Sequence, residues 1–112
     1  MKKLLLIALY AGFMHTLNAQ IYVEGVELQP TNTGHYIEID PAFRSDGHCI
    51  FHVDYGQPTG QNDYVSDAQG RRLDFRSVVD GLNIFYANGW EVETVYSVGN
   101  NNARRYLLKR RF

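Results

Sequence analysis

The sequence lacks the features of a disulfide-rich protein, of a zinc site made of several cysteines and of a membrane-spanning helix. The 112 residues include one cysteine, Cys49, which excludes an internal disulfide framework and a zinc site made of several cysteines. The longest apolar run spans only residues 4–13, whereas a helix that crosses a bilayer needs about 20 apolar residues. Lysine and arginine number 11 against 12 aspartate and glutamate residues, so no net charge draws the chain to nucleic acid or to an anionic membrane.

What remains is the composition of a small folded domain. Hydrophobic residues make up 45% of the chain and aromatic residues 13%, which argues against intrinsic disorder. The length suffices for one domain and is too short for two.

Residues 1–19 have the three parts of a secretory signal. Two lysines form the positive start, residues 4–13 the apolar middle, and Ala19 the small residue before a cleavage site. An N-terminal core helix is the alternative, but the run lacks a polar face. We expect cleavage before Gln20, so that residues 20–112 form one domain exported to the periplasm or the medium. The residue directly after the cleavage site is not a cysteine, which argues against a lipoprotein.

Alternation of apolar and polar residues predicts β-strands around a long polar loop. Strands are expected at 21–28, 35–40, 48–57, 90–98 and 104–112. In the strand 48–57 one face carries Cys49, Phe51, Val53 and Tyr55, and the other carries His48, Ile50, His52 and Asp54. Residues 56–72 are rich in glycine and polar side chains, which predicts a loop with a short strand at Tyr64 and Val65.

Three further details of the strands follow from single residues. Gly25 is expected to form a β-bulge within the first strand. Pro41 is expected to end the second strand. In the strand 90–98, strict alternation places on one face Trp90, Val92, Thr94 and Tyr96.

Residues 77–88 have the pattern of an amphipathic helix. Ser77 followed by Asp80 is typical of a capping box at a helix start. The residues that recur at helical spacing are Val78, Leu82 and Phe85. Asn88 and Gly89 provide a left-handed stop.

One helix among several strands predicts an α+β fold. We expect a four- or five-stranded, mainly antiparallel sheet packed by the single helix at about 77–88. Gly81 lies inside this helix, where glycine costs about 1 kcal/mol relative to alanine. Close packing of the helix on the sheet would explain a glycine at that position.

Motifs in the second half of the chain resemble a known family. They are Leu82-Asn83, Asn88-Gly89-Trp90-Glu91-Val92 and Tyr106-Leu107-Leu108-Lys109-Arg110. Together they resemble the small-domain family DUF4177 over about residues 49–110, chiefly 77–110. The resemblance implies a helix that ends in a glycine turn into a strand, and it implies no activity. Trp90 is expected to fill the junction of sheet and helix rather than to stack on a ligand.

Metal-ligating side chains share one face of the strand 48–57. They are His48, His52 and Asp54, with His35 on the neighbouring strand. Histidine and aspartate bind divalent metals, but positions i and i+4 of a strand lie about 13 Å apart. Only His52 and Asp54 are therefore expected to converge. We expect a solvated sheet face and no cofactor, with these residues as the candidate metal ligands.

The motifs of nucleophilic catalysis are missing. Cys49 is expected on the buried face, opposite His48 and His52. The sequence contains neither Gly-x-Ser-x-Gly nor a phosphate-binding Gly-x-x-x-x-Gly-Lys motif. The enzymatic hypothesis is a hydrolase-like or metal-dependent enzyme that uses His52, Asp54 and the loop 56–72.

Cations gather near the C-terminus. The candidate interaction surface comprises Arg104, Arg105, Lys109 and Arg111. One hypothesis is a surface for an anionic ligand such as phosphate or an acidic glycan. The favoured hypothesis is an edge strand that charge protects against pairing with other sheets. Glu91 and Glu93 on the neighbouring strand are then the expected ion-pair partners.

These observations favour a non-enzymatic binding or accessory module of the cell envelope. The chain has 8 tyrosines, a residue type that suits contact with a protein or a glycan. An exposed edge strand would also let two copies pair. Export makes nucleic acid a poor partner.

N-terminal sequencing of the exported protein tests the predicted leader. We expect the exported chain to begin with Gln20, because Ala19 ends a typical signal. An exported form that still begins with Lys2 or Lys3 would contradict this prediction.

Overall fold

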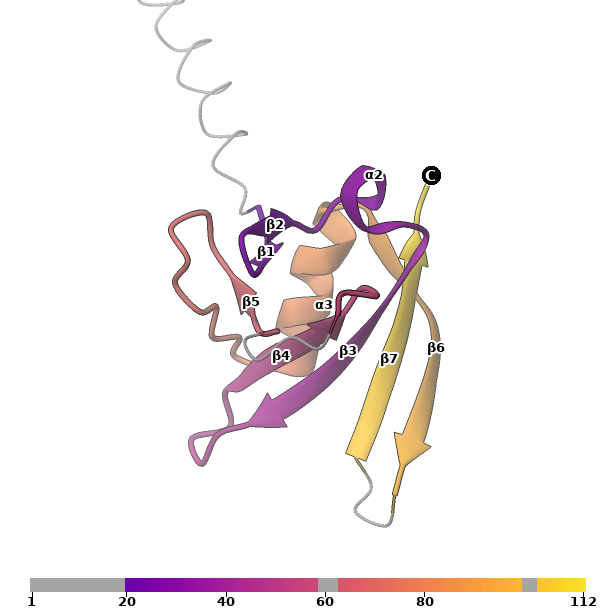
Figure 1. The fold of residues 1–112 in the computed structure, drawn as a ribbon. Helices are drawn as coiled ribbons and strands as arrows, with labels where there is room; N and C mark the ends of the chain where they lie inside the picture. Colours follow the sequence, from indigo (N-terminus) through magenta and orange to yellow (C-terminus); the bar gives the residue numbers. More distant parts are fainter. Residues whose placement is uncertain (1–19, 59–62, 100–102) are drawn as a thin grey trace, which may run out of the picture.

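The computed structural model describes residues 20–58, 63–99 and 103–112, so the predicted leader lies outside the described residues. In chain order the elements are β1 (Tyr22–Val23), β2 (Val26–Glu27), α2 (Pro30–Thr33), β3 (Tyr36–Phe43), β4 (Cys49–Asp54), β5 (Val65–Ser66), α3 (Val78–Ala87), β6 (Trp90–Val98) and β7 (Ala103–Arg110). The order β4-β3-β7-β6 makes a larger antiparallel sheet, and β2-β1-β5 makes a small one (Figure 1).

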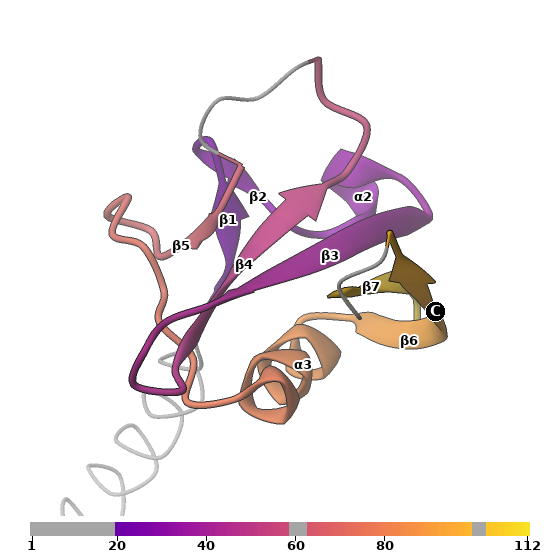
Figure 2. The same ribbon diagram turned by 90° about the horizontal axis from the view of Figure 1, so that it is seen from below.

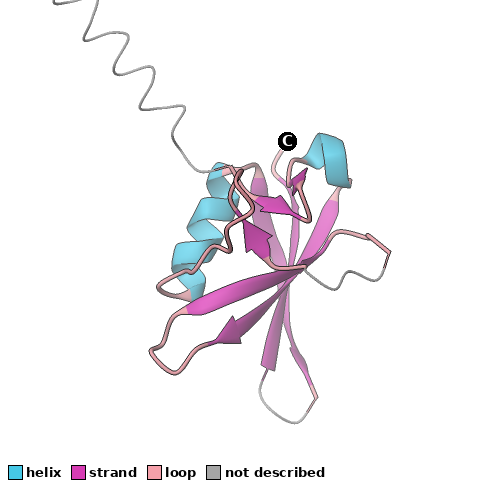
Figure 3. Ribbon diagram, turned by 60° about the vertical axis from the view of Figure 1, so that its left-hand side comes forward, coloured by secondary structure: helices cyan, strands magenta, loops and turns pink. Residues whose placement is uncertain are grey.

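Helix α3 covers one face of the larger sheet, as Figures 2 and 3 show from two directions. We call this the inner face and the opposite one the outer face. The predicted α+β fold, an antiparallel sheet packed by one helix, is confirmed, although the strands divide into two sheets. None of the described helices is long and apolar enough to cross a membrane.

The N-terminal strand predicted at 21–28 is instead a tight hairpin. Strands β1 and β2 pair antiparallel, with Val23 opposite Val26. Between them, Glu24 has φ 52° and Gly25 has φ 78°, the positive values that the two central residues of a type I′ turn require. The bulge predicted at Gly25 is therefore wrong, because this glycine turns the chain back on itself.

The prediction that Pro41 ends its strand is also wrong, since β3 continues to Phe43. Cys49 exchanges two backbone hydrogen bonds of 2.8 Å with Phe75, on the side away from β3. The backbone N–H and C=O of Phe51, two residues further along β4, point away from β3 like those of Cys49. The pair of Phe51 and Pro41 therefore shares no hydrogen bond. The Pro41 nitrogen faces the side of β7, whose pairing with β3 stops at Ile39. A proline is tolerated there because no bond is lost.

Helix α3 begins and ends where the sequence predicts. The Ser77 hydroxyl accepts a hydrogen bond of 3.1 Å from the Asp80 backbone N–H. The Asp80 carboxylate in turn accepts one of 3.0 Å from the backbone N–H of Arg76. Asn88 caps the C-terminus, and Gly89 follows at φ 97°, the left-handed conformation that lets the chain leave the helix.

The core lies between α3 and the inner face, and two residues fix how closely they approach. A Cβ on Gly81 would lie 2.4 Å from two ring atoms of Phe51, so only glycine fits there. Trp90 is fully buried, and its indole N–H donates to the Leu28 carbonyl oxygen at 3.0 Å. Both structural predictions, close packing at Gly81 and a buried Trp90, are confirmed.

Strand β6 departs from strict alternation at a bulge. Its register against β7 shifts between Val92 and Thr94, so Glu93 is the extra residue. Beyond the bulge, Thr94 and Tyr96 lie on the outer face and Val95 on the inner face. The prediction that Trp90, Val92, Thr94 and Tyr96 share one face is therefore wrong in its second half, because a bulge exchanges the two faces.

Replacing Gly81 by alanine tests the close packing. Alanine raises intrinsic helix propensity by about 1 kcal/mol, but the clash with Phe51 costs about 1–3 kcal/mol. We expect Gly81→Ala to lower the free energy of unfolding in a denaturant titration. The exposed helix residue Asn83 supplies the control, since Asn83→Ala gains propensity without a clash. The cost of Gly81→Ala should shrink in a Phe51→Leu background, and an unchanged cost would contradict this account.

Candidate functional site

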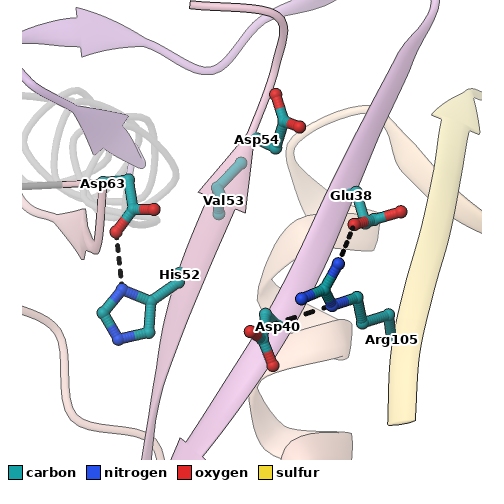
Figure 4. Close-up of a pocket in the computed structure, with 7 residues that line it drawn as sticks. All are labelled: Glu38, Asp40, His52, Val53, Asp54, Asp63 and Arg105. Carbon is teal, nitrogen blue, oxygen red and sulfur yellow. Dashed lines mark hydrogen bonds and ion pairs between the residues drawn. The ribbon is translucent and has the colours of Figure 1, made fainter. Parts of the chain in front are cut away.

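The outer face carries charged side chains from three adjacent strands. The register places Glu38 opposite Asp54, and Asp40 opposite His52, while Arg105 comes from β7 on the other side of β3. These residues surround a hollow of about 200 Å³ (Figure 4). Its lining consists of Glu38, Asp40, His52, Val53, Asp54, Asp63 and Arg105.

One side of this hollow is an ion pair between His52 and Asp63. The His52 Nδ1 lies 2.6 Å from the Asp63 Oδ1, and both side chains are more than one third exposed. The backbone holds Asp63 in place, because its carbonyl oxygen accepts a hydrogen bond of 2.8 Å from the Val53 N–H. The described part of the loop predicted at 56–72 therefore adds a carboxylate to the site.

The other side centres on Arg105 and Glu38. The Arg105 guanidinium lies 3.5 Å from Glu38 and 3.9 Å from Asp40, and Figure 4 shows it between the two carboxylates. The Tyr96 hydroxyl donates a hydrogen bond to the second oxygen of Glu38. This bond to a carboxylate raises the pKa of Tyr96 above its usual value.

A second hollow, of about 270 Å³, adjoins the first. Glu38 and Asp54 line both hollows. The lining of the second is completed by Tyr36, Ile37, Tyr55, Gly56 and Leu107. The outer face thus has a charged hollow and a more apolar hollow that meet at two carboxylates.

The candidate metal ligands do not converge. His52 faces Asp63, whereas His48 lies 3.6 Å from Asp74. Among the described residues, no group of three or more histidine, cysteine, aspartate or glutamate side chains is placed to hold a metal ion. His52 and Asp54 do line the same hollow, as their spacing predicted, but His48 is not part of it.

The C-terminal cations are distributed rather than gathered into one surface. Strand β7 lies between β3 and β6, so the hypothesis that it is an edge strand is wrong. Lys109 pairs with Glu93 at 3.0 Å and approaches Glu91 at 3.9 Å, as predicted from the sequence. The hydrogen bond to Glu93 raises the pKa of Lys109.

The remaining cations have separate surroundings. Arg105 belongs to the charged hollow, and the Arg111 guanidinium stacks 4.1 Å from the centre of the Tyr86 ring. Arg104 is exposed. Acidic partners and an aromatic ring therefore occupy most of the surface predicted for an anionic ligand.

Cys49 has no place in the site. It is fully buried on the inner face, opposite His48 and His52 as predicted. Burial, together with the negative charges of Asp74 and Asp80, raises the pKa of its thiol. Its thiolate is therefore scarce at neutral pH, which argues against a nucleophilic role.

Four polar residues of the site were missed by the sequence pattern: Glu38, Asp40, Asp63 and Tyr96. Asp63 lies in a polar stretch without periodicity, and Tyr96 was assigned to the wrong face because of the bulge. Glu38 and Asp40 alternate with apolar residues along their strand, but alternation gives no information about which strand lies beside it.

Comparison of the chain with protein-family models, curated protein sequences and solved structures found no match. The resemblance to DUF4177 therefore stays a prediction.

Titration of Tyr96 tests the geometry of the charged hollow. The raised pKa implies stabilisation that is complete below the ordinary tyrosine pKa and is lost as the pH rises through the raised one. We expect Glu38→Gln to lower the pKa of Tyr96, measured by NMR of its ring carbons, because the carboxylate acceptor becomes a neutral amide. Glu24→Gln, in the β1–β2 turn, is the matched loss of an exposed charge. A Tyr96 titration that is the same in both variants would contradict this arrangement.

Proposed function

We propose that the chain is an exported, non-enzymatic binding module whose outer face binds a lysine or arginine side chain of a protein partner. The observation that carries this proposal is the junction of two hollows at Glu38 and Asp54. Carboxylates lie on one side of the junction, and tyrosines with Leu107 lie on the other. A lysine or arginine side chain has a charged head that can pair with the carboxylates and an apolar stem that can pack against the tyrosines and Leu107.

Charge supports a cationic ligand. The first hollow is lined by four carboxylates against one guanidinium and one histidine. Asp40 has a side chain that is 48% exposed, and Asp54 is also exposed. The guanidinium of Arg105 already lies between two of these carboxylates, so the hollow is chemically suited to such a group.

Tyrosines support the contact with the apolar stem. Tyr36 is 55% exposed and lines the second hollow beside Tyr55 and Leu107. Aromatic rings bind cations and aliphatic chains in the same site. A glycan partner would use the same rings without needing the carboxylates, so the two partners differ in their dependence on charge.

The enzymatic alternative has less support. The pair of His52 and Asp63 resembles a base held by a carboxylate. However, the two hollows are lined by no serine, threonine or cysteine, so this pair has no neighbouring nucleophile among the described residues. His52 and Asp63 fit better as the wall of a binding site.

Asp54→Asn gives a sharp test of the proposal. The Asp54 Oδ1 accepts a hydrogen bond from the Gly56 N–H at 2.8 Å, which asparagine retains while it loses the charge. Asp46→Asn is the matched control, because Asp46 accepts an equivalent bond of 3.0 Å from the His48 N–H in a distant turn. Both variants should fold normally, and each removes one negative charge.

The probes are a hexalysine peptide and a hexaglutamate peptide, added to the exported protein and followed by NMR chemical shifts. We expect hexalysine to shift signals around Glu38 and Asp54, and hexaglutamate to leave them in place. Losing one exposed ion pair of about 0.2–1 kcal/mol should weaken hexalysine binding about 1.5- to 5-fold in Asp54→Asn, and added salt should weaken it further. Equal losses in Asp54→Asn and Asp46→Asn, or binding of a neutral glycan that neither variant affects, would contradict the proposal.

A further inference from the structure

The two edges of the larger sheet differ in how they are covered. At the β4 edge, Cys49 bonds to Phe75 in both directions, and the Val53 N–H donates to Asp63. The chain itself therefore closes this edge. At the other edge is β6, and in the described residues it pairs only with β7. Figures 1 and 2 show no described element next to the free edge of β6, on the side away from β7.

Backbone register identifies which groups point outward from β6. The Arg110 N–H donates to His35 and the Arg111 N–H to Gly89, which fixes the alternation along β7. Across from it, Thr94, Tyr96 and Val98 direct their backbone N–H and C=O groups toward β7. Val95 and Ser97 therefore direct theirs to the open edge.

The end of β6 lacks the usual protection of an edge strand. Natural edges carry charges, prolines or bulges, and in β6 the bulge at Glu93 and the two glutamates lie before Thr94. The segment 94–98, Thr-Val-Tyr-Ser-Val, has no charge, proline or glycine. It consists mainly of residue types that favour strands. Val95 is 43% exposed and Tyr96 is 40% exposed.

From this edge we infer that two copies of the chain pair antiparallel through residues 94–98 of β6, with the twofold axis at Tyr96. This register places Tyr96 opposite Tyr96 and Val95 opposite Ser97. The outward groups of Val95 and Ser97 then meet those of the partner copy, which gives four backbone hydrogen bonds between the copies.

Charge and side-chain packing favour a second copy over a different peptide. In this register Glu93 faces Gly99 of the other copy, so no like charges meet. Each Tyr96 side chain extends over β7 toward Glu38, which leaves room for the close approach of the two strands at this position. The two larger sheets become one continuous sheet, and the exposed Val95 gains a neighbour from the partner copy. The segment is thus complementary to itself.

The oligomeric state of the exported protein is the first test. Light scattering across a concentration series should give twice the mass of the chain at high concentration and a falling mass on dilution. Ser97→Pro removes an N–H that points outward and breaks no bond to β7, so it should raise the dissociation constant of the dimer about tenfold or more. Ser97→Ala keeps the N–H and should leave the dimer unchanged. A monomer at every concentration, or a dimer that Ser97→Pro does not weaken, would overturn the inference.

Disulfide cross-linking tests the register without relying on the proline variant. In a pair that shares no hydrogen bond, Cα atoms lie about 4.5 Å apart, which is within the range for a disulfide. Tyr96→Cys should therefore form a dimer band that a reducing agent removes. Thr94→Cys, on the same face, should not, because it faces Val98, and the native Cys49 is buried. The inference that a second copy pairs with the β6 edge would be contradicted if the two variants cross-linked equally. It would also be contradicted if the cysteine variants cross-linked only to a different protein. Asp54→Asn lies outside this edge, so failure of the dimer is distinguishable from failure of the proposed ligand site.

Discussion

The burial of Trp90 is the constraint on which the arrangement of the chain depends. Its indole N–H reaches the Leu28 carbonyl, so one side chain joins the start of β6 to the N-terminal segment, 62 positions away in sequence. Truncating a buried tryptophan costs about 3–5 kcal/mol, and an unpaired Leu28 carbonyl would add a desolvation cost. Because Trp90 pairs with Arg110, this anchor also sets the register of β7. Because β7 lies between β3 and β6, the Trp90 anchor also helps to position Glu38 and Tyr96 near Arg105.

The bulge at Glu93 gives the two halves of β6 different roles. Before it, Glu91 and Glu93 neutralise Lys109. After it, the strand carries no charge, and Tyr96 has moved to the outer face, where its hydroxyl reaches Glu38. If the same residues alternated strictly, without a bulge, Tyr96 would share the inner face with Trp90 and the charged hollow would lose one of its hydrogen bonds. One inserted residue therefore shapes both the candidate site and the open edge.

Local patterns predicted the parts of the fold whose causes are local. The alternation around Phe51 and the cap at Ser77 depend on residues a few positions apart, and the structure has both. The errors about β7 and about the site concern pairing between distant segments. Nothing near Arg105 shows that β7 lies between two strands, and nothing near Asp63 shows that its carbonyl bonds to Val53. For the same reason His52 and Asp54 were identified as candidates from one strand, whereas the hollow around them needs three strands and a loop.

The proposed site and the proposed interface are geometrically coupled. A twofold axis through an antiparallel strand pair is perpendicular to the sheet, so both outer faces point in the same direction. Two copies of the charged hollow, each lined by Arg105 from the strand next to β6, would then face the same partner. A partner with two suitably spaced basic side chains would bind more tightly than either contact allows, because the second contact forms at high effective concentration. Exposed carboxylates provide only weak individual sites. A dimer that presents two such sites can nevertheless bind its partner tightly.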